Sequence, residues 1–430
     1  MKQKEGRLIL KVLFVNRTFR NMLIASVASQ LGTIIGNIAF AFYLLDRYIN
    51  MPIYAILAEL MYSLPTLVVF FIVGVVADRF DRKKIAENTG WIRAGLTLLL
   101  ILFIYLNYLP VVFAILFIRS AVAKFFSPAE VSLLQGVLNK EEYLLATGLF
   151  QMIFGVFMLF GVSLGGIAYT FLGVIGALCL DVAGFIVSAT LMRLSNIHID
   201  IRLPNGRTRL QDIRLSMVIG DFKEGLLYIL KNRLLLSIIC GYFILGFFNG
   251  FFSVLPMLTM KYKLAPDDYK QFASLFAIFL GIGFLVGSMV ISSFIKKVKP
   301  YRIIIIGLMI SGVMVGALGT IQNVWTYLII VFLAGTVFAP LNIAVGGWVQ
   351  ELIDKTFMGR VTAWVDPLMM LAHSAALSGV AFFYPKVIGL EYLYYSAGIA
   401  LLLISLMYAL TLPLLVREKE QSETSLPATG

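Results

Sequence analysis

The chain has 430 residues, of which 60% are hydrophobic and only 13% are charged, compared with about 25% charged residues in an average soluble domain. This composition excludes an ordinary soluble protein. The formal net charge of +12 would suggest nucleic-acid binding in a soluble chain. Here the basic residues lie in short segments beside apolar runs, so membrane topology accounts for them better.

Cysteine and histidine are too few to build a disulfide framework or a metal site. Cys179 and Cys240 both lie inside apolar runs, and His198 and His373 are the only histidines. No GxxxxGK[ST] sequence occurs, so direct use of ATP is not expected. We therefore expect no metal, no cofactor, no catalytic residues and no enzymatic activity.

Apolar runs of about twenty residues, the length that crosses a bilayer, recur along the whole chain. They predict an all-α membrane protein with twelve transmembrane helices, between a tail of residues 1–19 and a tail of residues 417–430. In chain order, the predicted spans are 20–45, 52–76, 88–107, 110–137, 143–170, 173–194, 234–258, 271–295, 301–321, 324–350, 360–384 and 391–416.

Lysine and arginine gather at alternate ends of these spans. They are frequent in the N-terminal tail and in segments 78–87, 193–233 and 296–302, whereas the turn near Asn323 has none; segment 259–270 is the exception. Basic residues mark the cytoplasmic ends of membrane helices. The pattern predicts a multi-pass protein of the cytoplasmic membrane with both termini in the cytoplasm.

The second half of the chain echoes the first at an offset of about 212–215 residues. FFSPAE (125–130) recurs as VFAPLN (337–342), and LQGVLNK (134–140) recurs as VQELIDK (349–355). Two six-helix pseudo-repeats of parallel topology are typical of transporters that work by alternating access.

The repeat divides the chain into a bundle at 20–194, a connection at 195–232 and a bundle at 233–416. Within and just after the connection, DFKEGLLYILKNR (221–233) has apolar residues at helical spacing. This segment predicts an amphipathic helix at the membrane surface, and a plain tether is the alternative.

The segment GVVADRFDRKK (74–84) follows an apolar run and ends in a basic turn. It resembles the loop between the second and third helices of the major facilitator superfamily, although Asp81 stands where that family usually has glycine. The resemblance implies a gating motif made of Gly74, Asp78, Arg79, Arg82 and Lys83. In that motif, Asp78 would brace helix ends while the transporter faces outward. The alternative is that these charges only set the topology.

Further segments resemble the macrolide-efflux and siderophore-exporter branch of this superfamily. They are SVASQLGTIIGNIAFAFYLL in the first span, LFIRSAVAKFFSPA in the fourth, FKEGLLYILKN before the seventh and MGRV before the eleventh. The resemblance implies secondary efflux driven by the proton motive force, and it leaves the substrate open.

Glycines in the predicted fifth span partly match the antiporter motif of the superfamily. The matching residues are Gly148, Gly161, Gly165 and Gly166. Phe157 and Val162 replace a glycine and the proline of that motif. Small residues predict close helix packing, and a glycine-rich helix without a coupling role is the alternative.

Charged residues inside the spans are the site candidates, because a charge in the hydrocarbon region is costly and by default suggests a function. The candidates for proton coupling are Glu59, Asp181, Arg119 and Asp366. Asp181 lies in LDVAGF, which resembles an acidic segment of the exporter branch, and Arg119 resembles an arginine beside that superfamily's proton site. The alternative is a structural role, as hydrogen-bonded carboxylates and a buried ion pair. Lys124 and Glu130 are further charges in the fourth span.

Polar side chains at approximate helical spacing in the first span, together with Met and Phe residues, predict an apolar substrate path with a few polar groups. The candidates are Gln30, Thr33, Asn37, Met152 and Phe248.

These observations predict a secondary active transporter that exports small amphipathic, drug- or macrolide-like compounds by proton antiport. The alternatives are an exporter or facilitator of a native metabolite or siderophore, and a membrane sensor or scaffold that does not transport. The expected partners are the substrate, protons and membrane lipids, with no nucleic acid, and we expect a monomer. The terminal LPATG (426–430) resembles a sortase recognition sequence without the apolar stretch and basic tail of a sorting signal, so a chance match or a tag is expected.

Overall fold

The computed structural model describes residues 16–203, 215–294, 298–353 and 358–424, and all regular structure in these ranges is helical. The chain divides into two compact units, residues 1–215 and 216–430. The terminal LPATG lies outside the described residues.

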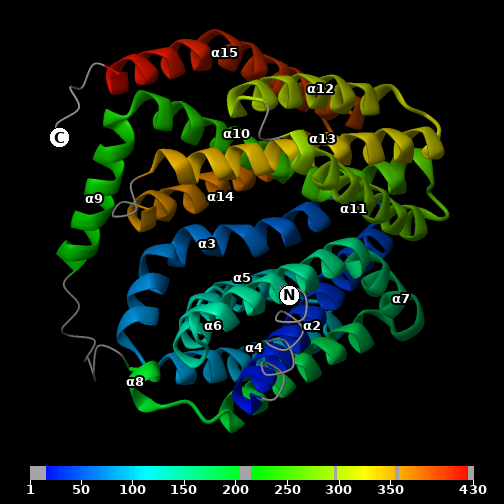
Figure 1. Ribbon diagram of the computed structural model, residues 1–430. Coiled ribbons are helices and arrows are strands. Elements are labelled where there is room, and N and C mark those ends of the chain that lie inside the picture. The colour runs from blue at the N-terminus through cyan, green and yellow to red at the C-terminus, as the bar shows by residue number, and fades with distance from the viewer. Residues whose placement is uncertain (1–15, 204–214, 295–297, 354–357, 425–430) are drawn as a thin grey trace. The chain divides into compact units, whose positions relative to one another are not determined.

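The first unit is built from seven helices in the described part of the chain (Figure 1). They are α2 (Arg17–Arg47), α3 (Ile53–Arg79), α4 (Arg82–Tyr105), α5 (Leu109–Ala123), α6 (Phe126–Val137), α7 (Lys140–Leu194) and α8 (Ile199–Arg202). Helix α2 packs along α7, which is its most extensive partner.

The second unit contains α9 (Leu215–Lys231), which begins at the unit boundary, and seven further elements. They are α10 (Arg233–Thr259), the π-helix η2 (Met260–Leu264), α11 (Tyr269–Phe294), α12 (Pro300–Thr320), α13 (Val324–Leu352), α14 (Met358–Phe383) and α15 (Leu390–Thr424). Helix α9 contains residues 221–231 of the predicted amphipathic segment 221–233, whose last two residues cap and begin α10. It exposes Leu227 and Leu230 while it buries Ile229. Helix α15 continues eight residues beyond the predicted end of the last span at 416.

Ten helical segments of the described chain are long and apolar enough to cross a membrane, and two shorter apolar helices, Leu145–Phe157 and Pro367–Phe383, accompany them. This set is consistent with the predicted twelve. The predicted fifth and sixth spans are joined in α7, which is interrupted at Gly173 with φ of 66°. Glycine adopts a positive φ without steric cost, so the chain turns there with no separate loop.

The predicted fourth span, 110–137, is one helix in the sequence analysis and two helices in the structure. Helix α5 ends at Ala123 and α6 begins at Phe126. Pro128 has no backbone N–H and cannot donate to the carbonyl of Lys124, four residues earlier, which explains the interruption. The aligned Pro340 of the second unit, in contrast, lies inside a continuous α13.

The basic turn at 78–87 also differs from its prediction as a loop. Arg82, Lys83 and Lys84 form the first turn of α4. Asp81 caps this helix, because its carboxylate accepts hydrogen bonds from the backbone amides of Lys83 (3.1 Å) and Lys84 (3.2 Å) that have no partner inside the helix. The residue that departs from the family pattern thus sets where the helix begins.

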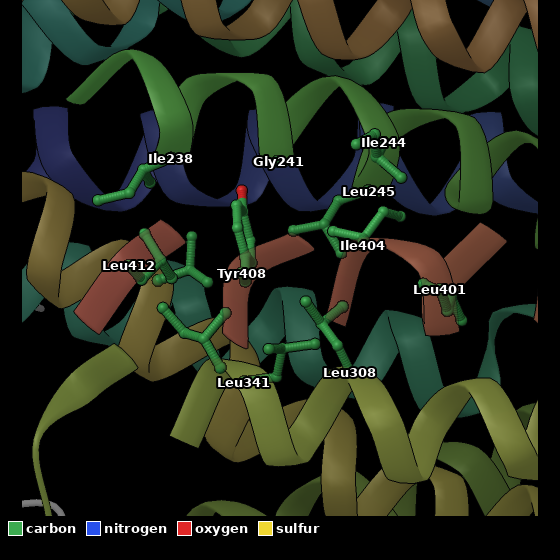
Figure 2. A pocket seen from close by; sticks show the side chains of 12 residues that line it. Ile238, Gly241, Ile244, Leu245, Leu308, Leu341, Leu401, Ile404, Tyr408 and Leu412 are labelled. Carbon is green, nitrogen blue, oxygen red and sulfur yellow. The ribbon is translucent and has the colours of Figure 1, made fainter. Parts of the chain in front are cut away.

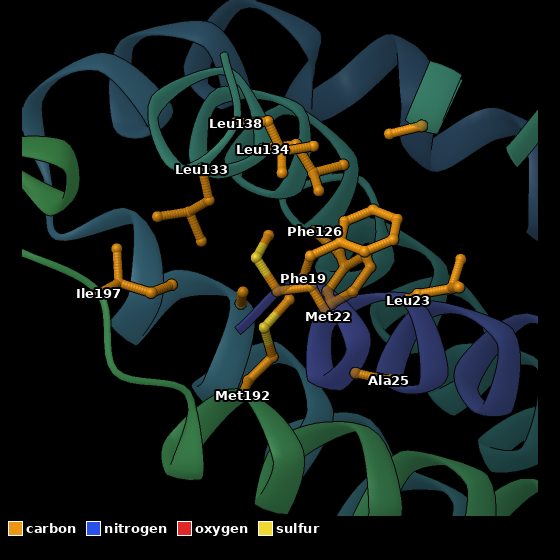
Figure 3. Close-up of a cluster of buried hydrophobic side chains, with 12 residues drawn as sticks. Phe19, Met22, Leu23, Ala25, Phe126, Leu133, Leu134, Leu138, Met192 and Ile197 are labelled. Carbon is orange, nitrogen blue, oxygen red and sulfur yellow. The ribbon is translucent and has the colours of Figure 1, made fainter. Parts of the chain in front are cut away.

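An apolar cluster closes one end of the first unit, where α2 begins and α6 ends (Figure 3). Phe19 and Met22 of α2 pack there with Phe126, Leu133 and Leu134 of α6, and all five side chains are buried. Met192, Ile197 and other apolar residues complete it. We call this set the end cluster.

Candidate functional site

The centre of the first unit holds an ion pair between Arg119 of α5 and Asp181 of α7. Nη1 of Arg119 lies 2.6 Å from Oδ2 of Asp181, and the two side chains are 4% and 0% exposed. Arg119 also donates to Oγ1 of Thr97 at 3.2 Å and to Oδ1 of Asn37 at 2.6 Å. Oδ1 of Asp181 has no hydrogen-bond partner among the described residues.

Glycines of α2 make room for this carboxylate. A Cβ atom added to Gly32 would lie 2.9 Å from the Cα of Asp181, and one added to Gly36 would lie 3.2 Å from its Oδ2. Both distances are shorter than ordinary contacts, so a side chain at either position would push α2 away from α7. Small residues spaced by four let membrane helices approach closely, and here they enclose a charged group.

A second buried arginine, Arg93 of α4, was missed in the sequence analysis. Its guanidinium donates to Oγ of Ser29 (3.3 Å) and Oγ1 of Thr33 (2.8 Å) and stacks 3.9 Å above the ring of Phe185. Arg93 also interacts electrostatically with Asp181. The available signal was its place inside the predicted span 88–107, where any charge qualifies as a candidate.

The three polar residues predicted to line the substrate path all form side-chain hydrogen bonds within the first unit, two of them with the buried arginines. Asn37 accepts from Arg119, and Thr33 accepts from Arg93. Gln30 donates to the hydroxyl of Ser26 at 3.0 Å. Together with Ser26 and Ser29, these residues follow one face of α2 at spacings of three and four, and we call this face the polar stripe.

Glu59 of α3 interacts electrostatically with Lys124, which follows α5. The neighbouring Ser120 donates to the backbone carbonyl of Tyr62 at 2.7 Å, so α5 is joined to α3 beside this pair of charges. Asp366 lies outside the described side chains. Among the four proton-coupling candidates, the structure therefore brings Arg119 and Asp181 into direct contact.

The predicted gating motif is described in part. Gly74, Asp78 and Arg79 belong to α3, but their surroundings lie outside what the structure describes; Arg82 is half-buried in the first turn of α4. Nζ of Lys83 donates to the carbonyl of Arg193 at 2.8 Å, which joins the start of α4 to the end of α7.

Asp81 makes a second connection at the same place. Its Oδ1 accepts from Nε of Arg202 at 3.1 Å, and its Oδ2 accepts from Nη2 of the same residue. Burial alone would raise the pKa of Asp81, but the hydrogen bonds from Arg202, Lys84 and Lys83 outweigh it and hold the pKa below its usual value. The same pairing raises the pKa of Arg202. The charges thus stabilise each other and fix α8, the first helix after α7, to the start of α4.

Two of the glycines from the predicted antiporter motif lie against α2. A Cβ atom on Gly161 would lie 2.7 Å from a methyl carbon of Ile34, and one on Gly165 would lie 2.5 Å from the Cβ of Ile38. Gly166 is buried, and Gly148 lies outside the residues whose surroundings are described. Apart from Gly173, α7 keeps helical geometry throughout, including at Val162, where the family motif has proline.

The second unit carries aromatic rings rather than buried acids at its centre. The ring centroids of Phe248 and Phe252 on α10 lie 4.4 Å apart, and the ring centroid of Phe338 on α13 lies 5.3 Å from that of Phe248. The ring centroid of Tyr394 on α15 lies 6.4 Å from that of Phe252. The hydroxyl of Tyr394 shares a hydrogen bond of 2.8 Å with the hydroxyl of Tyr327. Among the residues of this unit whose burial is described, no carboxylate is buried. Met152 in the first unit, the other apolar path candidate, is 71% exposed.

A closed apolar pocket in the second unit does not offer a binding site. It lies among α10, α12, α13 and α15, and the ring of Tyr408 points into it toward Gly241 (Figure 2). Its cavity volume is about 20 Å³, which is room for roughly one water molecule. Among the described residues, no group of three or more His, Cys, Asp and Glu side chains is placed to hold a metal ion.

The model of the Major Facilitator Superfamily matches residues 12–377 of this chain. The chain belongs to the major facilitator superfamily. Membership makes it a membrane transport protein rather than an enzyme, and it accounts for the multi-pass helical architecture. The prediction of the fold from the sequence is confirmed.

Relatives of this superfamily member differ widely in identity. The uncharacterized MFS-type transporter YkuC of Bacillus subtilis (strain 168) is 50% identical over 402 residues, which cover 93% of this chain and 94% of YkuC. Macrolide efflux protein A of Streptococcus pyogenes is 22% identical over 387 residues, covering 88% and 92% of the two chains.

Solved structures of POT transporters have a similar fold. The in meso crystal structure of the POT family transporter PepTSo has a TM-score of 0.73 at 12% identity, covering 94% of this chain and 99% of that one. A peptide transporter POT in complex with sulfate has a TM-score of 0.73 at 11% identity, with 94% and 95% covered. At such identities the likeness extends to the fold alone.

Proposed function

We propose that this superfamily member exports small amphipathic compounds across the cytoplasmic membrane in exchange for protons, by alternating access and with both termini in the cytoplasm. The observation that carries the proposal is the buried pair of Arg119 and Asp181, a titratable carboxylate with no solvent contact beside a permanent cation. Intramembrane carboxylates that face a cation in the bundle interior are typical of proton-driven transport.

The pair offers a direct route from proton binding to conformational change. A proton on Asp181 removes its negative charge and leaves Arg119 with neutral partners only, Asn37 and Thr97. An unpaired buried cation costs several kcal/mol. Protonation of Asp181 therefore favours a conformation in which Arg119 has a different partner, and a ligand or proton can shift a conformational equilibrium only through such a difference.

Two further observations support the export of amphipathic compounds. Phe248, Phe252 and Phe338 are half-buried and form a contiguous aromatic set, the kind of lining that binds apolar portions of small molecules. The macrolide efflux proteins, although only 22% identical, match most of the chain's length. The basic segments near the predicted cytoplasmic ends support the proposed orientation.

Uptake into everted membrane vesicles tests the proposal with a fluorescent cationic dye and a labelled macrolide. We expect uptake against a concentration gradient when the vesicle interior is acidic, and its loss when ΔpH is collapsed. Asp181→Asn is expected to abolish this accumulation, whereas Asp200→Asn, at a carboxylate that is 83% exposed, serves as the matched control. Uptake that is unaffected by collapse of ΔpH would contradict proton coupling and favour a facilitator. No transport of any compound by the folded protein would favour a sensor or scaffold.

A further inference from the structure

A second buried carboxylate, Glu130 of α6, lies in the first unit away from Asp181. Its side chain is 7% exposed. One oxygen accepts a hydrogen bond from the hydroxyl of Ser26 on α2, while Oε1 has no hydrogen-bond partner among the described residues. No described lysine or arginine forms an ion pair with it, in contrast to Asp181.

These surroundings fit a neutral carboxylic acid better than a carboxylate. A buried ionised carboxylate needs a countercharge or several hydrogen-bond donors to offset its desolvation, and Glu130 has one hydroxyl donor. A bound proton removes the charge and with it most of the cost. Asp181 has the opposite surroundings, because its charge is neutralised by Arg119.

The polar stripe of α2 connects the two carboxylates. Ser26 contacts Glu130 at one end, and the Thr33 hydroxyl contacts Asp181 at the other. Ser29 and Gln30 lie between them on the same face. Seven residues of helix separate Ser26 from Thr33, or about 10 Å. The hydroxyl groups of Ser26, Ser29 and Thr33 both donate and accept hydrogen bonds, so this part of the stripe is suited to proton movement along α2.

We propose that Glu130 is a second proton-carrying residue of this transporter, which receives along the polar stripe the proton that Asp181 gives up. The O–H bond of protonated Asp181 breaks and an O–H bond forms on Glu130. Asp181 becomes the carboxylate that pairs with Arg119, and Glu130 becomes neutral, which is the distribution of charge that the surroundings of both residues favour. This inference rests on the proposed proton coupling.

The end cluster explains how such a proton is held. Phe126, Leu133 and Leu134, on the same short helix as Glu130, pack with Phe19 and Met22 at the start of α2 (Figure 3). While the cluster is packed, Glu130 is 7% exposed. Separation of α6 from α2 breaks the contact with Ser26, hydrates Glu130 and releases its proton there.

Infrared difference spectroscopy on the purified full-length protein tests the protonation directly and needs no substrate. We expect a carbonyl stretching band of a protonated carboxylic acid at neutral pH, lost in Glu130→Gln and retained in the control Asp200→Asn. Equal carboxylic-acid bands in wild type and Glu130→Gln would overturn the inference. Glu130→Gln keeps the size of the side chain, and its melting temperature shows whether it folds.

Vesicle transport separates this inference from the proposed function. Glu130→Gln is expected to lose accumulation driven by ΔpH and to keep downhill equilibration of the same dye, and Ser26→Ala is expected to slow accumulation. If wild type depends on ΔpH and Glu130→Gln accumulates dye equally well, Glu130 carries no transported proton while the proposed function stands. If wild type does not depend on ΔpH, the proposed function fails, and with it the transport role of Glu130.

Discussion

Arg119 and Asp181, 62 residues apart in the chain, form an ion pair of 2.6 Å that is shielded from solvent on all sides. Both charges lie within helical segments long and apolar enough to cross a membrane. Such a pair is retained at a desolvation cost that apolar side chains of similar size would avoid. The proposed proton coupling, which needs a charge that can be neutralised, would account for its retention.

Removing one partner is expected to destabilise the first unit. Asp181→Asn leaves Arg119 buried with neutral partners, at a cost of roughly 3–5 kcal/mol. The double variant Asp181→Asn/Arg119→Gln removes the lone charge and is expected to melt at a higher temperature than Asp181→Asn alone. Thermal unfolding in detergent measures both. A single variant as stable as wild type would contradict the buried pairing.

Arg93 is expected to matter for transport more than for folding. Arg93→Met keeps apolar contact with Phe185 and removes the hydrogen bonds to Ser29 and Thr33. Because the desolvation cost of a buried cation offsets much of what its hydrogen bonds contribute, we expect little loss of stability and a reduced transport rate per folded molecule. The matched control is Arg193→Met, at an arginine that is 72% exposed. Equal rates for wild type and Arg93→Met would count against a role for Arg93.

The contact between Asp81 and Arg202 is expected to contribute a coupling energy of about 0.5–1 kcal/mol in a double-mutant cycle. This is the range found for ion pairs that remain partly exposed to solvent. The cycle uses Asp81→Asn, which retains an N-cap side chain, and Arg202→Gln. Thermal unfolding of the four proteins at neutral pH measures the coupling. A coupling of zero there would contradict the contact.

The same contact has an expected pH dependence. The pKa of Asp81 is lowered in the folded protein, so its contribution to stability is fully present above the pKa of an unfolded aspartate, about 3.9. The contribution is lost as the pH falls through the lower folded-state value. We therefore expect the double-mutant coupling to disappear at strongly acidic pH, and a coupling that grows on acidification would have the wrong sign.

The close approach of α2 and α7 can be tested by adding a methyl group at a glycine where the two helices meet. Gly32→Ala places a methyl group 2.9 Å from the Cα of Asp181, a backbone atom that cannot turn aside. Overpacking of this kind costs about 1–3 kcal/mol, measured as a lower melting temperature. Gly155→Ala on α7 meets no atom within 4 Å, and we expect it to be neutral or slightly stabilising because alanine favours the helix.

Much of the architecture follows from the sequence, because the length and apolarity of each span are local properties. The break between α5 and α6 follows from Pro128, although the sequence analysis treated 110–137 as one helix. The functional candidates Arg119 and Asp181 were recognisable one at a time, since each is a charge inside an apolar run. Their pairing was not, because no local pattern relates residues on α5 and α7.

Two contacts show why side-chain partners were harder to predict than helices. Asp81 was visible only as a departure from a family pattern, and its partner Arg202 lies 121 residues further along the chain. Arg93 satisfied the same criterion as Arg119 and was overlooked, so a complete survey of charges within spans would have found it. Glu130 was noticed as a charge, but its lack of a cationic partner is a property of the fold.

The uneven distribution of buried acids has a consequence for how this protein can evolve. The described acids with little or no solvent contact belong to the first unit, whereas the described centre of the second unit holds aromatic rings and tyrosine hydroxyl groups. Under the proposed function, replacements at Phe248, Phe252 or Phe338 are expected to alter which compounds are recognised without touching Asp181 or Glu130. New specificities would then be accessible through single substitutions in one half of the gene, with the proposed energy-coupling residues in the other half unchanged.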